Sequence, residues 1–125
     1  MSLIHGMTSQ EFDVYCAKRL LGKLDNARQR GIEFNLSFTA IKNLMKAKRC
    51  YYTGVKLTLP TGGADTLKAN SLTIDRIDSS LGYVPGNVVA CSHAFNQLKA
   101  NVDSAGKQGM KMMSKAFKKA EERFQ

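Results

Sequence analysis

The chain has 125 residues with 19 Lys or Arg and 10 Asp or Glu, so its formal net charge is +9 and an anionic partner is expected, nucleic acid first. That length predicts a single domain over residues 1–125, and no apolar run approaches the ~20 residues of a membrane span. The cysteines at 16, 50 and 91 form no Cys-x-x-Cys pair, so we expect reduced thiols in a cytoplasm and no structural zinc.

Residues 8–49 are predicted to form a helical N-terminal part. Thr8 and Glu11 have the spacing of a capping box, and Gly31 suits the position just after a helix. Between them an apolar stripe recurs at helical spacing, at Phe12, Tyr15, Leu20, Leu21, Leu24 and Ala27. Ser37 can cap a second helix that reaches Met45. The basic residues of the first helix suit a solvated face, which is the simpler interpretation, or contact with a phosphate backbone.

The stretch 50–68 contains a predicted strand and a loop. Residues 50–54 are expected to run from a strand into a turn, with Tyr51 or Tyr52 at the rim of the core or against a nucleic acid. Pro60 and the pair Gly62-Gly63 predict a flexible loop over 57–68.

Residues 71–99 predict a strand, a loop, a second strand and a helix. The first strand ends at the acid Asp75, Val88 begins the second, and Ser92 is a plausible N-cap for the helix. A helix packed across this hairpin would bring Asp75 close to Asn96. Two oxygen donors at one point suit a hard cation such as Mg²⁺.

A last helix is predicted over 104–124, with Asp103 or Ser104 as its cap. We expect its apolar stripe to pack on the domain, with residues Met113, Phe117, Ala120 and Phe124. The lysines off that stripe, together with one on the preceding helix, are candidates for nucleic-acid binding: Lys99, Lys107, Lys111 and Lys115.

The order and spacing of these pieces resemble an HNH endonuclease of the ββα-metal (His-Me finger) superfamily, and most of all its small phage-type members. Asp-Arg-Ile-Asp at 75–78 precedes Gly-Tyr-x-x-Gly-Asn-Val at 82–88 and a helix with a late Asn, and the similarity extends to 30–37 and 50–54. The resemblance implies an α+β fold with a ββα-metal core over 50–101, flanked by N-terminal helices and a basic C-terminal helix. It also implies metal-dependent hydrolysis of DNA, most naturally double-stranded.

The resemblance also implies roles for single residues. Asp75 and Asn96 would hold one divalent ion, Mg²⁺ or alternatively Mn²⁺, and Asn87 would orient the catalytic side chain across the hairpin. This chain has Arg76 where the family has the His that acts as general base, and a guanidinium offers no acceptor for a proton. Arg76 is better suited to bind the scissile phosphate. His93 is a candidate replacement base or phosphate contact, or simply an exposed residue at the helix start.

Other interpretations stay open for the same residues. Arg76 favours a catalytically inactive HNH-like DNA-binding module, whereas Asp75 with Asn96 argues against a basic RNA-binding or structural protein without a metal. Asn87 also suits a plain turn position, and Asp75 suits a strand-end acid paired with a nearby cation. Asp78 is expected to pair with Arg76 or to bond within the loop.

Overall fold

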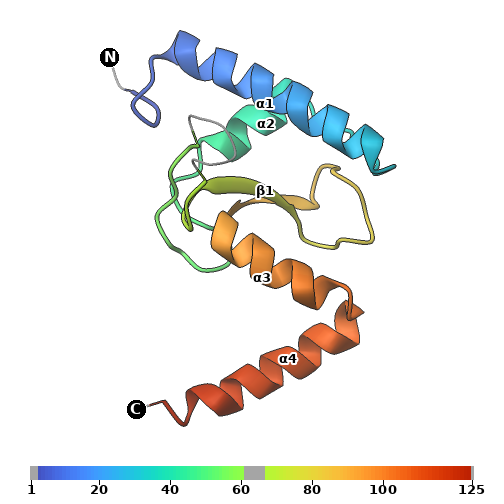
Figure 1. Cartoon of the computed structure of the whole chain (residues 1–125). Helices are drawn as coiled ribbons and strands as arrows, with labels where there is room; N and C mark the ends of the chain where they lie inside the picture. Colours follow the sequence, from blue (N-terminus) through green and yellow to red (C-terminus); the bar gives the residue numbers. More distant parts are fainter. Residues whose placement is uncertain (1–2, 61–66, 125) are drawn as a thin grey trace.

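The computed structural model describes residues 3–60 and 67–124, and this part of the chain contains four helices and a two-stranded antiparallel hairpin. In chain order the elements are α1 (Ser9–Gln29), α2 (Phe38–Met45), β1 (Leu72–Arg76), β2 (Val88–Ser92), α3 (His93–Asp103) and α4 (Gly106–Glu121). Helices α1 and α2 lie on one side of the hairpin and α3 lies on the other (Figure 1). The predicted α+β fold with a ββα core is confirmed.

The predicted start and stop of α1 are confirmed. The Thr8 backbone N–H donates to the Glu11 carboxylate at 2.8 Å, and the Glu11 N–H donates to the Thr8 hydroxyl at 3.2 Å. Gly31 follows the helix at φ +65°. One inward position was predicted wrongly, because Leu21 is 66% exposed while Cys16 is fully buried. Cys16 lies one helical turn after the buried Phe12, whereas Leu21 lies nine residues after Phe12, which at roughly 100° per residue puts it on the opposite face of the helix.

The core lies between α1, α2 and the hairpin. Ser37 caps α2 as predicted, since its hydroxyl accepts from the Ala40 N–H at 3.1 Å. The fully buried side chains include Phe12, Cys16, Ile41, Met45, Leu72 and Cys91. All three cysteines are buried free thiols.

Of the strand and turn predicted over 50–54, only the turn is present, and it is closed by its own backbone hydrogen bonds. The Cys50 N–H donates to the Val55 carbonyl, and the Gly54 N–H donates to the Cys50 carbonyl, both at 2.9 Å. The Tyr51 N–H donates to the Ala90 carbonyl of β2 at 2.9 Å, which holds the turn beside the hairpin. Backbone groups closed locally in this way are not free to form a ladder.

The predicted loop over 57–68 is only partly described. Leu57 is buried and Thr58 pairs with Ser71 just before β1, so its first residues belong to the packed domain. Gly62 and Gly63 lie outside the described residues.

The hairpin register sends alternate side chains to opposite faces. Leu72 pairs with Ser92 and Arg76 with Val88, so the strand ends one residue before Ile77. Leu72 and Ile74 are buried in the core, whereas Thr73 and Asp75 contact Asn96 and Lys99 of α3. This alternation delivers the Asp75 carboxylate to the junction of hairpin and helix.

The loop between the strands is held against the segment that follows α1. The Tyr83 N–H donates to the Glu33 carbonyl at 2.8 Å, and the Asn35 N–H donates to the Tyr83 carbonyl at 2.9 Å. A Cβ on Gly82 would lie 2.5 Å from the Glu33 carbonyl oxygen, so only glycine fits this crossing.

Helix α3 starts as predicted and α4 does not. The Ser92 hydroxyl accepts from the Phe95 N–H at 3.3 Å and caps α3. The predicted cap of the last helix is wrong, because Asp103 is still inside α3 and Ala105 takes the N-cap position of α4 without a side-chain bond. Asp103 is instead bonded to Lys99, one turn earlier on α3.

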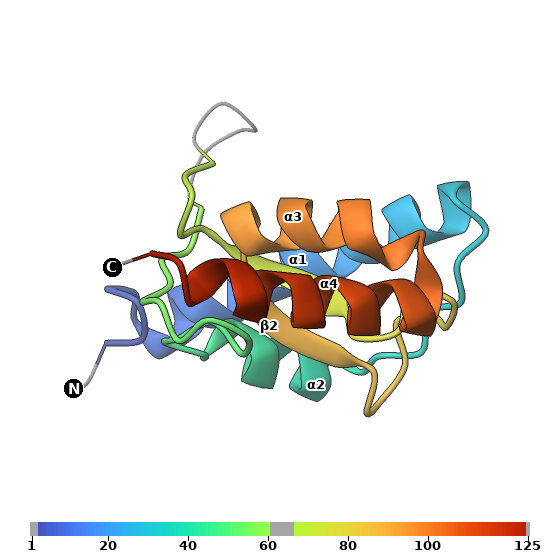
Figure 2. The same cartoon turned by 90° about the horizontal axis from the view of Figure 1, so that it is seen from below.

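The apolar stripe of α4 does not pack on the body of the domain, contrary to the prediction. Phe117 is 61% exposed, Phe124 is 83% exposed, and α4 buries none of its described residues. Helix α4 turns back at Gly106, where φ is +69°, and extends away from the core, alongside α3 only (Figures 1 and 2). None of the described helices has the length and apolar composition that crossing a membrane requires.

Candidate functional site

A small cavity of about 190 Å³ lies where β1 meets α1 and α3. Its lining includes three of the predicted site residues, Asp75, Arg76 and Asn96. The other lining residues are Lys23, Arg30, Ile74, Ser79, Tyr83, Ala100 and Asp103. Two acids, an amide and four aromatic or basic side chains therefore face one space.

Asp75 is buried and is bonded on one carboxylate oxygen. Its Oδ2 accepts from the Tyr52 hydroxyl at 2.7 Å and lies 3.3 Å from the Lys99 ammonium. Burial raises the pKa of Tyr52 far above its ordinary value, and the hydrogen bond to Asp75 raises that pKa further. The phenol therefore stays protonated at neutral pH and acts as a donor that orients the carboxylate. The sequence did not distinguish Tyr51 from Tyr52. The turn at 50–54 directs only the Tyr52 hydroxyl to Asp75.

Lys99 lies inside the site instead of on an outer basic surface. Its side chain is 7% exposed, and its ammonium donates to the Arg76 carbonyl at 2.9 Å and to both Asp103 oxygens at 3.0 Å. The charge thus sits between the carboxylates of Asp75 and Asp103. Because it is buried, Lys99 does not present its charge on the outer surface, where we expected it to contact a nucleic acid.

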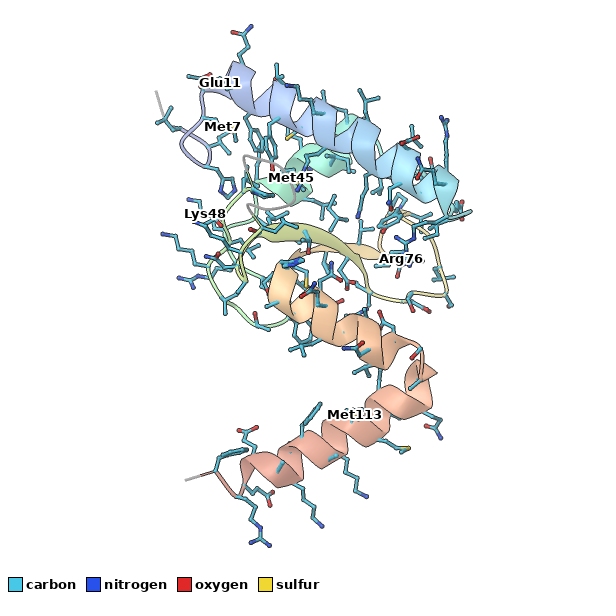
Figure 3. All side chains as sticks on the ribbon, in the orientation of Figure 1. Met7, Glu11, Met45, Lys48, Arg76 and Met113 are labelled. Carbon is cyan, nitrogen blue, oxygen red and sulfur yellow. The ribbon has the colours of Figure 1, made fainter. Side chains whose placement is uncertain are left out.

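The Arg76 side chain is held toward the loop between the strands (Figure 3). Its Nη1 donates to the Ser79 and Leu81 carbonyls at 2.9 and 3.0 Å, and its guanidinium lies 5.3 Å from the centre of the Tyr83 ring. The Lys23 ammonium lies 5.0 Å from the centre of the same ring. Two cations are therefore fixed at one wall of the cavity.

Asp78 bonds within the loop, which was the second of its two predicted alternatives. Its carboxylate accepts from the Ser80 hydroxyl at 2.6 Å and from the Ser80 N–H at 2.9 Å. Those two bonds, first from the hydroxyl and then from the backbone, lower the pKa of Asp78. Asp78 therefore supports the loop that Arg76 contacts.

Asn87 braces the same loop and does not line the cavity. Its amide oxygen accepts from the Asp78 N–H at 2.9 Å, and its amide nitrogen donates to the carbonyls of Asp78 and Gly82 at 3.1 and 2.9 Å. The structure thus shows it holding the hairpin loop closed, as its turn position suggested. Any influence of Asn87 on chemistry would run through the loop that carries the carbonyl partners of Arg76.

Asn96 and His93 share helix α3 but differ in what they face. The Asn96 amide nitrogen donates to the Thr73 hydroxyl at 3.0 Å, which directs the amide toward β1 and leaves its oxygen for another partner. His93 is the first residue of α3, and its backbone N–H donates to the Ser71 carbonyl at 2.8 Å. Among the described residues that line the cavity, His93 is not included. The α4 residues Lys107, Lys111 and Lys115 are exposed and are not part of that lining either.

Asp75 and Asn96 carry side-chain oxygens of the kind that a hard cation prefers. No group of three or more His, Cys, Asp or Glu side chains is placed to hold a metal within residues 3–60 and 67–124. A divalent ion at this site would depend on the Asp75 carboxylate and the uncommitted Asn96 oxygen. Mg²⁺ accepts so few protein ligands because it keeps several of its waters and takes substrate oxygens.

The hairpin and α3 form an HNH-like ββα fold. The solved structure of the rare-cutting HNH restriction endonuclease PacI is similar with a TM-score of 0.56 at 21% sequence identity, over 81% of this chain and 78% of that one. An uncharacterized 29.0 kDa protein from the dda-modA intergenic region of Enterobacteria phage T4 is 30% identical over 84 residues. That match covers 67% of this chain but only 32% of the phage protein, so this chain spans about a third of that relative. No family model matches the sequence.

Proposed function

We propose that this chain is an HNH-type endonuclease that hydrolyses DNA phosphodiester bonds with the help of one divalent metal ion. The observation that carries the proposal is the meeting of Asp75, Asn96 and Arg76 at one cavity of an HNH-like fold. The likeness in fold to PacI, an HNH restriction endonuclease by name, supports it.

Asp75 and Asn96 would hold the ion, which when bound would polarise the phosphate and stabilise the leaving oxygen. Tyr52 would keep the Asp75 carboxylate oriented through its 2.7 Å hydrogen bond. The guanidinium of Arg76 has N–H groups beyond its bonded Nη1, and these would bind a phosphate oxygen in the cavity. His93, at the start of α3 and outside the cavity lining, is the proposed base.

The charge around the cavity suits a phosphate backbone. Lys18, Arg19, Lys23 and Arg30 line a second cavity of about 550 Å³ between α1 and β1, and the last two also line the site. A phosphate chain following this face of α1 would pass Asp75. The exposed lysines of α4, Lys107, Lys111 and Lys115, would add non-specific affinity that falls with salt.

The test is to incubate supercoiled plasmid with the purified chain in Mg²⁺, in Mn²⁺ and in chelator. We expect metal-dependent nicking that is lost in Asp75→Ala and Asn96→Ala, because each removes one proposed metal ligand. Asp25→Ala, which changes an acid on the outer surface of α1, is the matched control and should cut like the wild type. His93→Ala tests the base, because a true base would lose most of its rate without losing metal binding.

The second candidate function is a DNA-binding module that does not cut. The observation that favours it is Arg76, which stands where a base is needed and is already bonded to the Ser79 and Leu81 carbonyls. Salt-sensitive plasmid binding with no nicking in either metal would select this function. Arg76→His would then be expected to restore cutting if the missing base is the only defect.

A further inference from the structure

Lys99 is a buried cation, and it lies beside the carboxylate to which a metal ion would be expected to bind. Its ammonium lies 3.3 Å from Oδ2 of Asp75, the first proposed metal ligand. It follows Asn96, the second proposed ligand, by three residues on α3, so the two side chains share a helix face. The side chains of Lys99 and Asp75 are each 7% exposed.

We propose that Lys99 is a tethered counter-ion for Asp75, and that a divalent metal ion binds at Asp75 only by displacing the Lys99 ammonium. The inference rests on the proposed metal dependence of this site. It assigns to Lys99 a control over metal affinity, in place of the contact with nucleic acid that the sequence suggested.

The first argument is electrostatic. A buried carboxylate without a partner is costly, and Lys99 supplies that partner when no metal is bound. A divalent ion that is coordinated by Asp75 would lie within a few ångström of an ammonium left in place, and their repulsion at low effective dielectric is strong. The two cations therefore compete for one carboxylate.

The second argument is that the ammonium has a place to go. Asp103 accepts from it through both oxygens at 3.0 Å, closer than the 3.3 Å to Asp75. Asp103 is one turn further along α3, so a small rotation of the Lys99 side chain toward Asp103 would release Asp75 without exposing a charge. The site can thus alternate between a lysine-bound and a metal-bound state.

The experiment measures Mn²⁺ binding to the full chain by electron paramagnetic resonance, in the absence of DNA. Lys99→Met keeps the apolar stem and removes the competing charge, so we expect Mn²⁺ to bind about tenfold more tightly than to the wild type. Adding Asp75→Asn to that variant should abolish the gain. The control is Lys23→Met, which removes a charge from the same cavity wall without freeing a carboxylate, and should change affinity by less than about threefold.

Lys99→Met removes the counter-ion of the buried Asp75 and of the partly buried Asp103, so its folding is followed by circular dichroism during the same titration. A variant that is unfolded without metal and regains the fold at Mn²⁺ concentrations below those that saturate the wild type supports the proposal. A variant that stays unfolded there counts against it. Lys99→Arg keeps the cation and is expected to bind Mn²⁺ no more tightly than the wild type.

The outcomes separate this inference from the proposed nuclease. Equal Mn²⁺ affinity in folded Lys99→Met and wild type, with plasmid still cut, would overturn the counter-ion and leave the nuclease in place. Tighter Mn²⁺ binding in Lys99→Met without cutting by either chain would support the counter-ion and remove the nuclease.

Discussion

At the scale of single residues, the hydroxyl of Tyr52 decides how the buried Asp75 carboxylate is held. The phenol donates to Oδ2 at 2.7 Å, and its ring lies 4.9 Å from that of Phe95 on α3. One side chain thereby ties the turn at 50–54 to both the strand and the helix of the ββα core. The neighbouring Tyr51 is 65% exposed and makes no such bond to Asp75.

Tyr52→Phe removes that donor and almost nothing else. We expect it to lower the free energy of unfolding by about 1–3 kcal/mol, because a buried charged acceptor loses a partner. The measurement is urea unfolding followed by circular dichroism at neutral pH. Tyr51→Phe is the matched control and should stay within about 0.5 kcal/mol of the wild type. Equal losses in the two variants would show that the bond to Asp75 contributes nothing measurable.

At the scale of elements, α4 differs from the other helices because its apolar face is uncovered. Residues Leu98 and Val102 of α3 and Met113 and Phe117 of α4 border a groove of about 460 Å³. Helix α1, by contrast, places Phe12 at 0% exposure in the core. Phe12 of α1 is therefore buried in the core, whereas Phe117 of α4 is largely exposed.

This contrast predicts different costs for the same kind of substitution. Phe12→Ala should lower the free energy of unfolding by about 3–5 kcal/mol, because it opens a cavity in the packed core. Phe117→Ala should change it by no more than about 0.5 kcal/mol, because that ring is 61% exposed. Chemical denaturation of both variants at one protein concentration makes the comparison. A large loss in Phe117→Ala would mean that something covers α4 in solution.

At the scale of the whole molecule, the excess positive charge is distributed unevenly about the site. The basic face of α1 borders the cavity that holds Asp75, whereas Lys48 and Arg76 lie on opposite sides of the molecule in Figure 3. A formal charge of +9 will attract any polyanion, so total affinity does not by itself locate the DNA. The salt dependence of binding by variants that lack particular cations does locate the DNA, because only cations that contact phosphates release counter-ions.

Neutralising two cations of α1 should therefore weaken DNA binding in a specific way. For Lys18→Gln with Arg30→Gln, we expect the slope of log affinity against log salt concentration to fall by about 1.8, the release from two phosphate contacts. The control is Lys48→Gln with Lys56→Gln, a pair of equal charge that should leave the slope nearly unchanged. Fluorescence anisotropy with labelled duplex over a salt series gives both slopes. Matching slopes for the two double variants would place the DNA elsewhere on the molecule.

The helices and strands of the ββα core, the N-caps of α1, α2 and α3, and the placing of Asp75 near the end of β1 were determined by the sequence alone. Capping bonds, turn glycines and strand alternation each involve residues a few positions apart, so their patterns are legible without the fold. The approach of Asp75 toward Asn96 was also predictable, because a helix that follows a hairpin packs across it. The ends of α3 and α4 escaped prediction because Asp103 was drawn into a bond with Lys99.

Only the tertiary structure decided which side chains complete the site. The hydroxyl of Tyr52 reaches Asp75, and the ammonium of Lys99 reaches the Arg76 carbonyl, each across 23 positions of sequence. A lysine on a predicted helix is expected in water, and only the buried Asp75 and the partly buried Asp103 beside it make an interior position favourable. The tertiary structure also decided that the apolar face of α4 is exposed. A stripe at helical spacing indicates an amphipathic helix and does not show what covers its apolar face.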